Sequence, residues 1–293
     1  MSSSSLPRSD NSGIVSKLRA AGCVFAEDEA QLLSSAARTP AELARMVDQR
    51  VAGLPIEHVV GWAEFCGLRI AVDPGVFVPR RRTEFLVRVA ADLASQVLGG
   101  RALGGQAPGL KRAVVVDLCC GSGAVGAALA TALADSPASA GTMAELHAAD
   151  IDPAAVRCAR RNVAAAGGQV YEGDLYDPLP TALRGRVDFL AANVPYVPTG
   201  DIGLLPAEAR VHEARVALDG GADGLDVLRR VAAAAPQWLA PGGCLLSETS
   251  ERQAPAAVEA FARSGLLPRR ATSAELNATV VIGTKRVKPQ VSR

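Results

Sequence analysis

Three short segments of the 293-residue chain carry groups that could hold a small ligand and act on it. One is a glycine-rich turn within "VVVDLCCGSGAVGAALA", residues 114–130. A second group is acidic, with Asp150 and Asp174 each following an apolar stretch. The third is "ANVPY", where Asn193 follows the apolar run 187–192. Polar side chains directly after buried strands favour a ligand site at one edge of a sheet.

The glycine-rich turn has the spacing GxGxxG at Gly121, Gly123 and Gly126. An apolar strand before it and a helical pattern after it would let backbone N–H groups approach a ligand closely. The spacing alone fits a nicotinamide dinucleotide or S-adenosylmethionine, and it also fits a tight strand-to-helix turn that binds nothing.

Acidic residues near this turn favour S-adenosylmethionine over a dinucleotide. Asp117 is badly placed beside a pyrophosphate but well placed for a ligand with positive charge. Asp150 could accept hydrogen bonds from both ribose hydroxyls, and Asp174 could accept from an adenine amine. The alternative for each is a solvated loop aspartate or a helix cap, as we expect for Asp152 before Pro153.

The segment Asn193 to Tyr196 could hold the group that reacts. The Asn193 side-chain carbonyl and the Val194 backbone carbonyl can accept both hydrogens of a planar NH2 group. They would hold its nitrogen in line with a sulfonium methyl group without a strong general base. Pro195 stiffens the turn, and Tyr196 supplies a flat wall. The alternative is a turn that only ends a strand.

Alternating strands and helices predict a mostly parallel sheet covered on both faces. The expected strands are 114–118, 146–149, 187–192 and 244–248, and the expected helices follow Gly123 and cover 153–166, 225–235 and 253–263. Two apolar stretches near Leu266 and at 279–283 are expected to close the sheet as an antiparallel pair. A glycine-rich surface loop is expected at 99–112.

The sequence of residues 1–79 predicts three separate units before the main domain. Residues 1–13 have the composition of a disordered leader, and residues 14–64 have helical spacing, with Thr39 and Pro40 starting one helix. Residues 65–79 alternate around Asp73-Pro74-Gly75, which predicts a β-hairpin linker to a domain at 80–293.

Composition limits the compartment and the partners. Lys and Arg number 31 against 30 Asp and Glu, so the net charge of +1 neither supports nor excludes a nucleic-acid partner. The six cysteines lack CxxC spacing and there are three histidines, which favours free thiols in a reducing compartment and no metal site. No apolar run reaches the length of a membrane span, and residues 1–13 lack an apolar signal core. We expect a cytoplasmic monomer.

Five segments together resemble the HemK/PrmC-like protein-(glutamine-N5) methyltransferases over about residues 50–285. They are "GLPIEHVVGWAEFCGL", "VFVPRRRTEFLV" beside the family's IPRPxTE, "DLCCGSGAVG", "ANVPYVP" beside NPPY, and "HEARVALDGGADGLDVLRR" beside EPxxALxGGxDG. The resemblance implies a class I methyltransferase fold: a Rossmann-like seven-stranded sheet with the last strand antiparallel, and a small N-terminal helical domain that recognises the substrate.

The resemblance also implies transfer of a methyl group from S-adenosylmethionine to a protein glutamine, in the family typically the GGQ glutamine of a peptide-chain release factor, with S-adenosylhomocysteine as product. It assigns cofactor contacts to Cys119, Cys120, Gly121, Ser122, Gly123, Asp150, Asp174 and Leu175, and the glutamine amide to Asn193, Val194, Pro195 and Tyr196. Asp117 and Asn193 also belong to the expected cofactor site.

Several positions depart from the family pattern. Val194 replaces the first proline of NPPY, Arg81 replaces a proline, and Cys119-Cys120 replace a Gly-Thr pair. These variants resemble a divergent subgroup of the family. The alternatives are an N-methyltransferase acting on a base of nucleic acid, a nicotinamide oxidoreductase, and a binder without catalysis.

Overall fold

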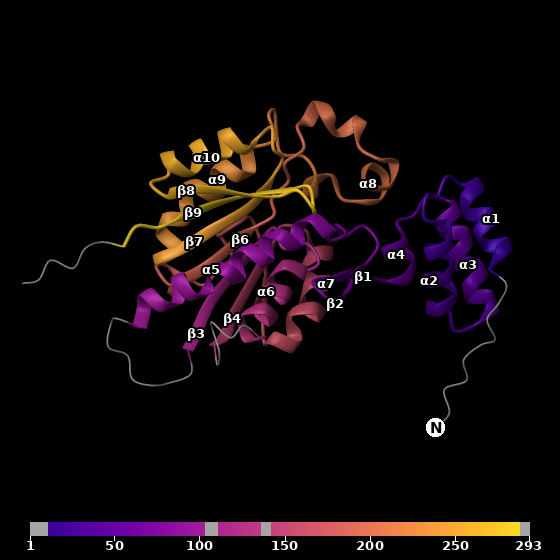
Figure 1. The fold of residues 1–293 in the computed structure, drawn as a ribbon, viewed down its shortest axis with the longest axis horizontal. Helices are drawn as coiled ribbons and strands as arrows, with labels where there is room; N and C mark the ends of the chain where they lie inside the picture. The colour runs from indigo at the N-terminus through magenta and orange to yellow at the C-terminus, as the bar shows by residue number, and fades with distance from the viewer. Residues whose placement is uncertain (1–10, 103–110, 136–141, 288–293) are drawn as a thin grey trace, which may run out of the picture.

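The structure is a computed structural model that describes residues 11–102, 111–135 and 142–287. Figure 1 shows a sheet covered by helices on both faces and a separate helical bundle joined to it by a short hairpin. None of the helices within these ranges is long and apolar enough to cross a membrane.

Seven strands form the sheet in the order β5-β4-β3-β6-β7-β9-β8. Their bounds are β3 Lys111–Leu118, β4 Thr142–Asp150, β5 Gln169–Glu172, β6 Val187–Ala192, β7 Leu239–Thr249, β8 Leu267–Ser273 and β9 Ala278–Thr284. β9 runs antiparallel to β7 and to β8, whereas the pairs among β5, β4, β3, β6 and β7 are parallel. The chain passes to opposite sides of β3 to form β4 and β6, which places a crevice at the carboxyl ends of these strands.

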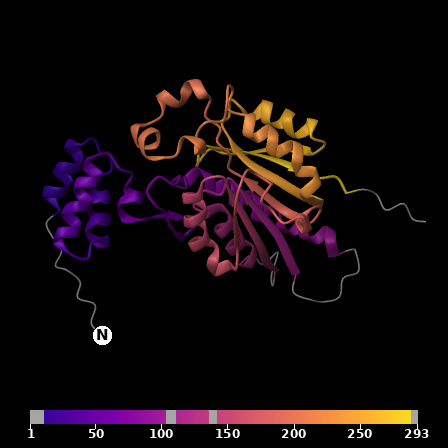
Figure 2. The same ribbon diagram turned by 180° about the vertical axis from the view of Figure 1, so that it is seen from behind.

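Helices bury both faces of the sheet (Figures 1 and 2). The helices α5 (Glu84–Ala102), α6 (Ala124–Asp135) and α7 (Pro153–Val163) share a core with one face, and α9 (Asp226–Trp238) and α10 (Ala254–Arg263) share a core with the other. On β3, Val115 packs in the first core, and Val114 and Val116 pack in the second. Burial of both faces explains why β6 is apolar along its whole length apart from Asp188, whose carboxylate accepts from the Val114 N–H at 2.9 Å.

The N-terminal helices form a small bundle with its own core. They are α1 (Ser12–Ala20), α2 (Ala26–Ala36), α3 (Pro40–Val51) and α4 (Ile56–Val60), and their buried side chains include Leu18, Leu33, Met46 and Val47. The Thr39 hydroxyl accepts from the Glu42 N–H at 3.1 Å, which confirms the expected start of α3. α1 begins at Ser12, so the predicted leader 1–13 is too long, and residues 1–10 lie outside the described ranges.

The predicted β-hairpin exists, but its turn was placed wrongly. β1 (Trp62–Phe65) pairs with β2 (Leu68–Ala71) around Cys66 and Gly67, whose φ values are 50° and 73°. Two positive φ values in succession give the turn a twist that matches a hairpin, whereas proline as the second residue of a turn splays its flanking strands. The Asp73-Pro74-Gly75 segment forms such a turn after β2, where the Val76 N–H donates to the Asp73 carbonyl.

Other boundaries also differ from the predictions. The predicted loop 99–112 is shorter, because α5 continues to Ala102 and β3 begins at Lys111, while 103–110 lie outside the described ranges. The helix expected at 153–166 is α7 followed by a 3₁₀ turn at Ala164–Ala166. α9 continues through Pro236, which lies in its last turn.

Asn162 on α7 ties the hairpin to the glycine-rich turn. Its Nδ2 donates to the Ala71 and Ser122 carbonyls, both at 2.8 Å, and its Oδ1 accepts from the Ala71 N–H at 2.9 Å. Cys158 on the same helix contacts the Ala71 carbonyl through Sγ at 3.1 Å. One helix therefore holds both the joint to the bundle and the turn at the end of β3.

We expect Asn162→Ala to lower the free energy of unfolding by about 1–3 kcal/mol, because it leaves partly buried backbone groups without partners. Urea denaturation of the variant and the wild type measures the difference. Unchanged stability would show that water replaces the lost hydrogen bonds at no cost.

Candidate active site

A cavity of about 200 Å³ lies at the carboxyl ends of β3, β4 and β6. Nearly every residue singled out in the sequence lines it: Asp117, Cys119, Cys120, Gly121, Ser122, Asp150, Asp174, Leu175, Asn193, Val194, Pro195 and Tyr196. Gly123 does not line it. A Cβ atom at Gly123 would lie 3.1 Å from the Ala159 Cβ, so this glycine allows α7 to pack closely against the turn.

Two aspartates hold the glycine-rich turn by accepting hydrogen bonds from its backbone and from the backbone beside it. The Asp150 carboxylate accepts from the Gly121 N–H at 2.8 Å and from the Asp152 N–H at 2.9 Å, which fixes the turn to the end of β4. Asp117 is 1% exposed and accepts from the Gly126 N–H at 2.8 Å, in the first turn of α6. Asp117 therefore connects β3 to the helix that follows the turn.

The Asp117 carboxyl group lies where a positive charge would be favourable. Burial, with a smaller contribution from nearby Asp150, raises the pKa of Asp117 to about 7, and the Gly126 N–H partly opposes this rise. Burial also raises the pKa of Asp150, while its hydrogen bonds from the backbone lower it. A cation bound in the cavity would offset the cost of ionising these carboxyl groups.

Asp174 already has a partner from the chain itself. The Arg230 guanidinium donates to Asp174 Oδ2 at 2.6 Å, and both side chains are substantially exposed. Leu175 adopts a φ of 50°, in the left-handed region. The role of Asp174 beside an adenine stays a prediction, and a ligand there would meet Arg230 as well.

The Asn193 side chain presents an acceptor that the protein does not use. Its Oδ1 is buried and has no hydrogen-bond partner within the part of the chain that the structure describes. Neighbouring Val194 is 2% exposed and packs in the core beside α9. A buried carbonyl oxygen without a donor is costly, and a ligand NH2 group in the cavity would remove that cost.

The segment 218–224, which follows α8 (Ala207–His212), holds the turn that carries Asn193. The Val197 N–H donates to the Leu218 carbonyl at 3.1 Å, and the Gly220 N–H donates to the Val197 carbonyl at 2.8 Å. A Cβ atom at Gly224 would lie 2.2 Å from the Tyr196 carbonyl oxygen, so only glycine fits there. These contacts explain the glycines in "ALDGGADG".

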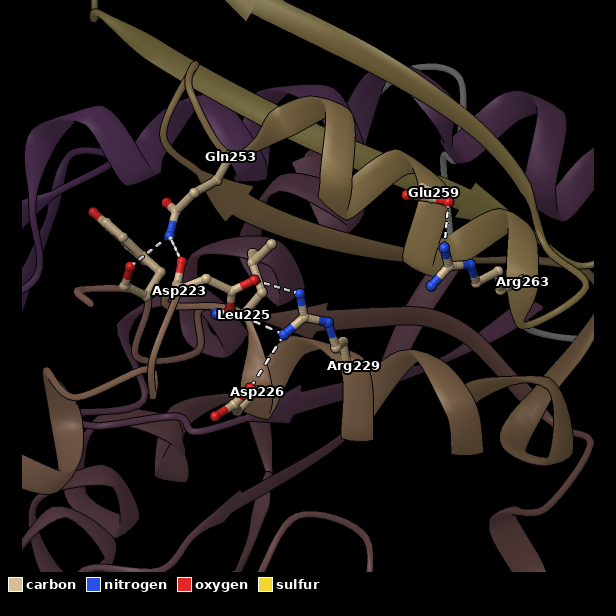
Figure 3. A network of polar contacts seen from close by, with 8 residues as sticks. Asp223, Leu225, Asp226, Arg229, Gln253, Glu259 and Arg263 are labelled. Atoms are coloured by element: carbon tan, nitrogen blue, oxygen red, sulfur yellow. Dashed lines mark hydrogen bonds and ion pairs between the residues drawn. The ribbon is translucent and has the colours of Figure 1, made fainter. Parts of the chain in front are cut away.

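Gln253 connects the turn that carries Asn193 to the glycine-rich segment that ends at Gly224. Its Nε2 donates to the carbonyls of Tyr196 and Asp223, both at 2.9 Å. Figure 3 shows Gln253 extending from the start of α10 toward Asp223. The turn that carries Asn193 is therefore held on both sides by the chain.

The lining of the cavity includes the apolar side chains of Phe77, Val216 and Leu218. A buried carboxylate holds Arg80, which also lines the cavity: Glu213 accepts from Arg80 at 2.6 and 2.7 Å and from the Val78 N–H at 3.1 Å. An uncharged side chain could pass these walls to reach Asn193.

Comparisons with known proteins fit this geometry. Residues 87–230 match the methyltransferase small domain. A release factor glutamine methyltransferase of Geobacter sulfurreducens is 36% identical over 231 residues, which cover 77% of this chain and 72% of that protein. The chain belongs to this family. A release factor glutamine methyltransferase of Streptomyces coelicolor is 35% identical over 208 residues, covering 71% of this chain and 67% of that protein.

A relative named for a different substrate has the same identity to this chain. The 4-amino-L-phenylalanine/4-methylamino-L-phenylalanine methyltransferase of Streptomyces pristinaespiralis is 36% identical over 220 residues, covering 75% of this chain and 69% of that protein. The predicted family and the class I methyltransferase fold are confirmed, with β9 as the antiparallel strand.

Several residues that shape the site were missed in the sequence. They are Arg82, Asn162, Glu213, Arg230, Glu248 and Gln253. Glu248 could have been found, because it ends a predicted buried strand as Asn193 does. Arg82, Glu213 and Arg230 lie within segments that carry the family resemblance, but the sequence did not show their contacts. Asn162 and Gln253 gave no signal, since their partners lie far away in the sequence.

Proposed function

We propose that this protein transfers a methyl group from S-adenosylmethionine to the side-chain amide nitrogen of a glutamine in a peptide-chain release factor. The observation that carries the proposal is the buried Asn193 Oδ1, which has no donor among the described residues. Membership of the release factor glutamine methyltransferase family supports the same reaction.

The residues of the cavity fit the cofactor. Gly121 and Ser122 bring the backbone of the turn to the cavity wall, Asp150 offers acceptors for ribose hydroxyls, and Asp117 favours a positive charge nearby. When bound, the cofactor supplies an activated methyl group on a sulfonium.

The chain's own contribution is to place the acceptor nitrogen. Asn193 Oδ1 and the Val194 carbonyl would accept the two amide hydrogens and aim the nitrogen lone pair at the methyl group. Electron density drawn toward the nitrogen would favour its change from planar to pyramidal as the bond to carbon forms. The bond between sulfur and the methyl carbon would break in the same step, and the nitrogen would afterwards lose one proton to solvent. The apolar side chains that line the cavity would surround the aliphatic part of the glutamine and keep water out.

A second candidate acceptor is an aromatic amine, because a relative named for 4-amino-L-phenylalanine matches at the same identity as the glutamine methyltransferases. The experiment is to incubate the protein with methyl-labelled S-adenosylmethionine and either a purified release factor or 4-amino-L-phenylalanine. We expect label in the release factor, located by mass spectrometry to the glutamine of GGQ. Label in the aromatic amine, or nuclease-sensitive label in a cell lysate, would replace this proposal.

Binding of the cofactor should depend on pH. Because Asp117 has a pKa of about 7, protons compete with a cationic ligand below that pH. We expect affinity for S-adenosylmethionine to rise as pH increases from about 6 to about 8, and affinity for uncharged S-adenosylhomocysteine to change less. Calorimetric titrations at several pH values test this.

Asp117→Asn is the control for that titration. Asparagine keeps an oxygen for the Gly126 N–H but cannot ionise, so the difference between the two ligands should lose its pH dependence. The same pH dependence in this variant would assign the effect to another group.

We also propose that the protein acts as a cytoplasmic monomer. All six cysteines are free, as expected from their spacing, which supports a reducing compartment.

A further inference from the structure

A buried carboxylate at the end of β7 is bonded to the aromatic wall of the acceptor site. Glu248 is 3% exposed. The Tyr196 hydroxyl donates to Glu248 Oε1 at 3.1 Å, and Arg82 Nε donates to the same oxygen at 2.9 Å. The Arg82 guanidinium also donates to the Tyr196 hydroxyl oxygen. Three side chains from separate segments therefore close a ring of hydrogen bonds.

These hydrogen bonds determine whether the Tyr196 hydroxyl can exchange a proton. Its hydrogen is used by Glu248 and a lone pair is used by Arg82, so it is not free to exchange a proton with an acceptor. Burial and the neighbouring Glu248 also raise the pKa of Tyr196. The hydroxyl therefore anchors the aromatic ring of Tyr196, and the face of that aromatic ring contributes to the cavity.

Arg82 is the cation that makes the burial of Glu248 tolerable. The side chain of Arg82 is 47% exposed, and Arg82 lines the cavity, whereas Glu248 does not. The Arg82 guanidinium carbon also lies 5.7 Å from the centre of the Tyr196 ring. A buried carboxylate that lost this partner would be strongly unfavourable.

We propose that Glu248 is a positioning residue for methyl transfer: together with Arg82 it fixes the Tyr196 ring against which the acceptor amide lies. This inference rests on the proposed function, and it adds a residue outside the cavity to the reaction. Glu248 touches neither cofactor nor acceptor. Its effect reaches the acceptor through the Tyr196 hydroxyl.

A double-mutant cycle tests the inference. Glu248→Met, Tyr196→Phe and the double variant are compared with wild type for kcat/KM toward the acceptor, with calorimetry for affinity toward S-adenosylmethionine. We expect each single variant to lose about tenfold in kcat/KM, mainly through a higher KM for the acceptor, with cofactor affinity within about twofold. The double variant should lose no more than either single variant, because both remove the same anchor.

Glu259→Met is the matched control, since it removes a carboxylate that pairs with Arg263 on the surface of α10, as Figure 3 shows. It should leave kcat/KM unchanged. Losses that multiply in the double variant, or no loss in Glu248→Met, would overturn the inference. The proposed function is tested separately with the wild-type enzyme. The double-mutant cycle is then measured with whichever acceptor the wild-type enzyme methylates.

A stability measurement covers variants that fold poorly. Arg82→Met should lower the melting temperature because it leaves Glu248 charged and unpaired, and adding Glu248→Gln should restore most of the loss. If the second substitution lowered the melting temperature further, the buried carboxylate would not be the reason for the pairing.

Discussion

Asn193→Ala should lower the rate of methyl transfer by a factor on the order of 10² to 10³ while leaving affinity for S-adenosylmethionine within a few-fold. The alanine removes the buried oxygen that has no partner in residues 11–102, 111–135 and 142–287 and that would accept a hydrogen of the acceptor amide. Single-turnover assays with a saturating release factor measure the rate, and calorimetry measures cofactor binding.

The control for this variant is Asn193→Asp, which keeps an oxygen at the same place. We expect it to retain more activity than the alanine variant, because a carboxylate still accepts hydrogen bonds from an NH2 group. A wild-type rate in Asn193→Ala would contradict the mechanism, since no other step assigned to the chain could replace this contact.

Asp150→Ala should weaken binding of S-adenosylmethionine by about 100-fold, a loss of about 2.7 kcal/mol. The carboxylate holds the Gly121 and Asp152 N–H groups, so its loss removes acceptors for a ribose and also frees the turn that would approach the ligand. Calorimetric titration of S-adenosylmethionine measures the effect directly. Unchanged affinity would place the ribose elsewhere in the cavity.

Asp152→Ala separates that effect from general instability. Asp152 lies two residues further along and caps α7 by accepting from the Ala154 N–H at 2.8 Å. Its loss should cost about 1 kcal/mol of stability with little change in cofactor affinity. Equal losses of affinity in the two variants would point to the shape of the turn and not to the Asp150 carboxylate.

Much of the fold could be predicted because buried strands and helix starts have recognisable local sequence patterns. Residues 187–192 are apolar apart from Asp188 since both faces of β6 are covered, and Asp152 before Pro153 supplies the cap and the first-turn proline with which α7 starts. The β-hairpin was harder. Cys66 gives no sign that it adopts a positive φ, whereas Asp73-Pro74-Gly75 has turn composition whether or not its flanks pair.

The candidate site divides in the same way. Asp150 and Asn193 could be predicted to line one cavity, because Asp150 ends β4, Asn193 follows β6, and the carboxyl ends of parallel strands meet. The contacts that hold them could not be found. Glu213 binds Arg80 across more than a hundred residues, and Gln253 reaches Tyr196 from a different helix, so neither pair has a spacing to recognise.

The hydrogen bonds of Asn162 have a consequence for protein engineering. Because this residue ties β2 to the glycine-rich turn, the hairpin belongs mechanically to the sheet and not to the bundle. A chimera that exchanges the N-terminal helices of two relatives should therefore be cut at Gly61, between α4 and β1. The graft would need to reproduce the contacts of Arg50 with Glu208 and of His58 with the Val76 carbonyl, and the predicted role of these helices in acceptor choice could then be tested without rebuilding the cofactor pocket.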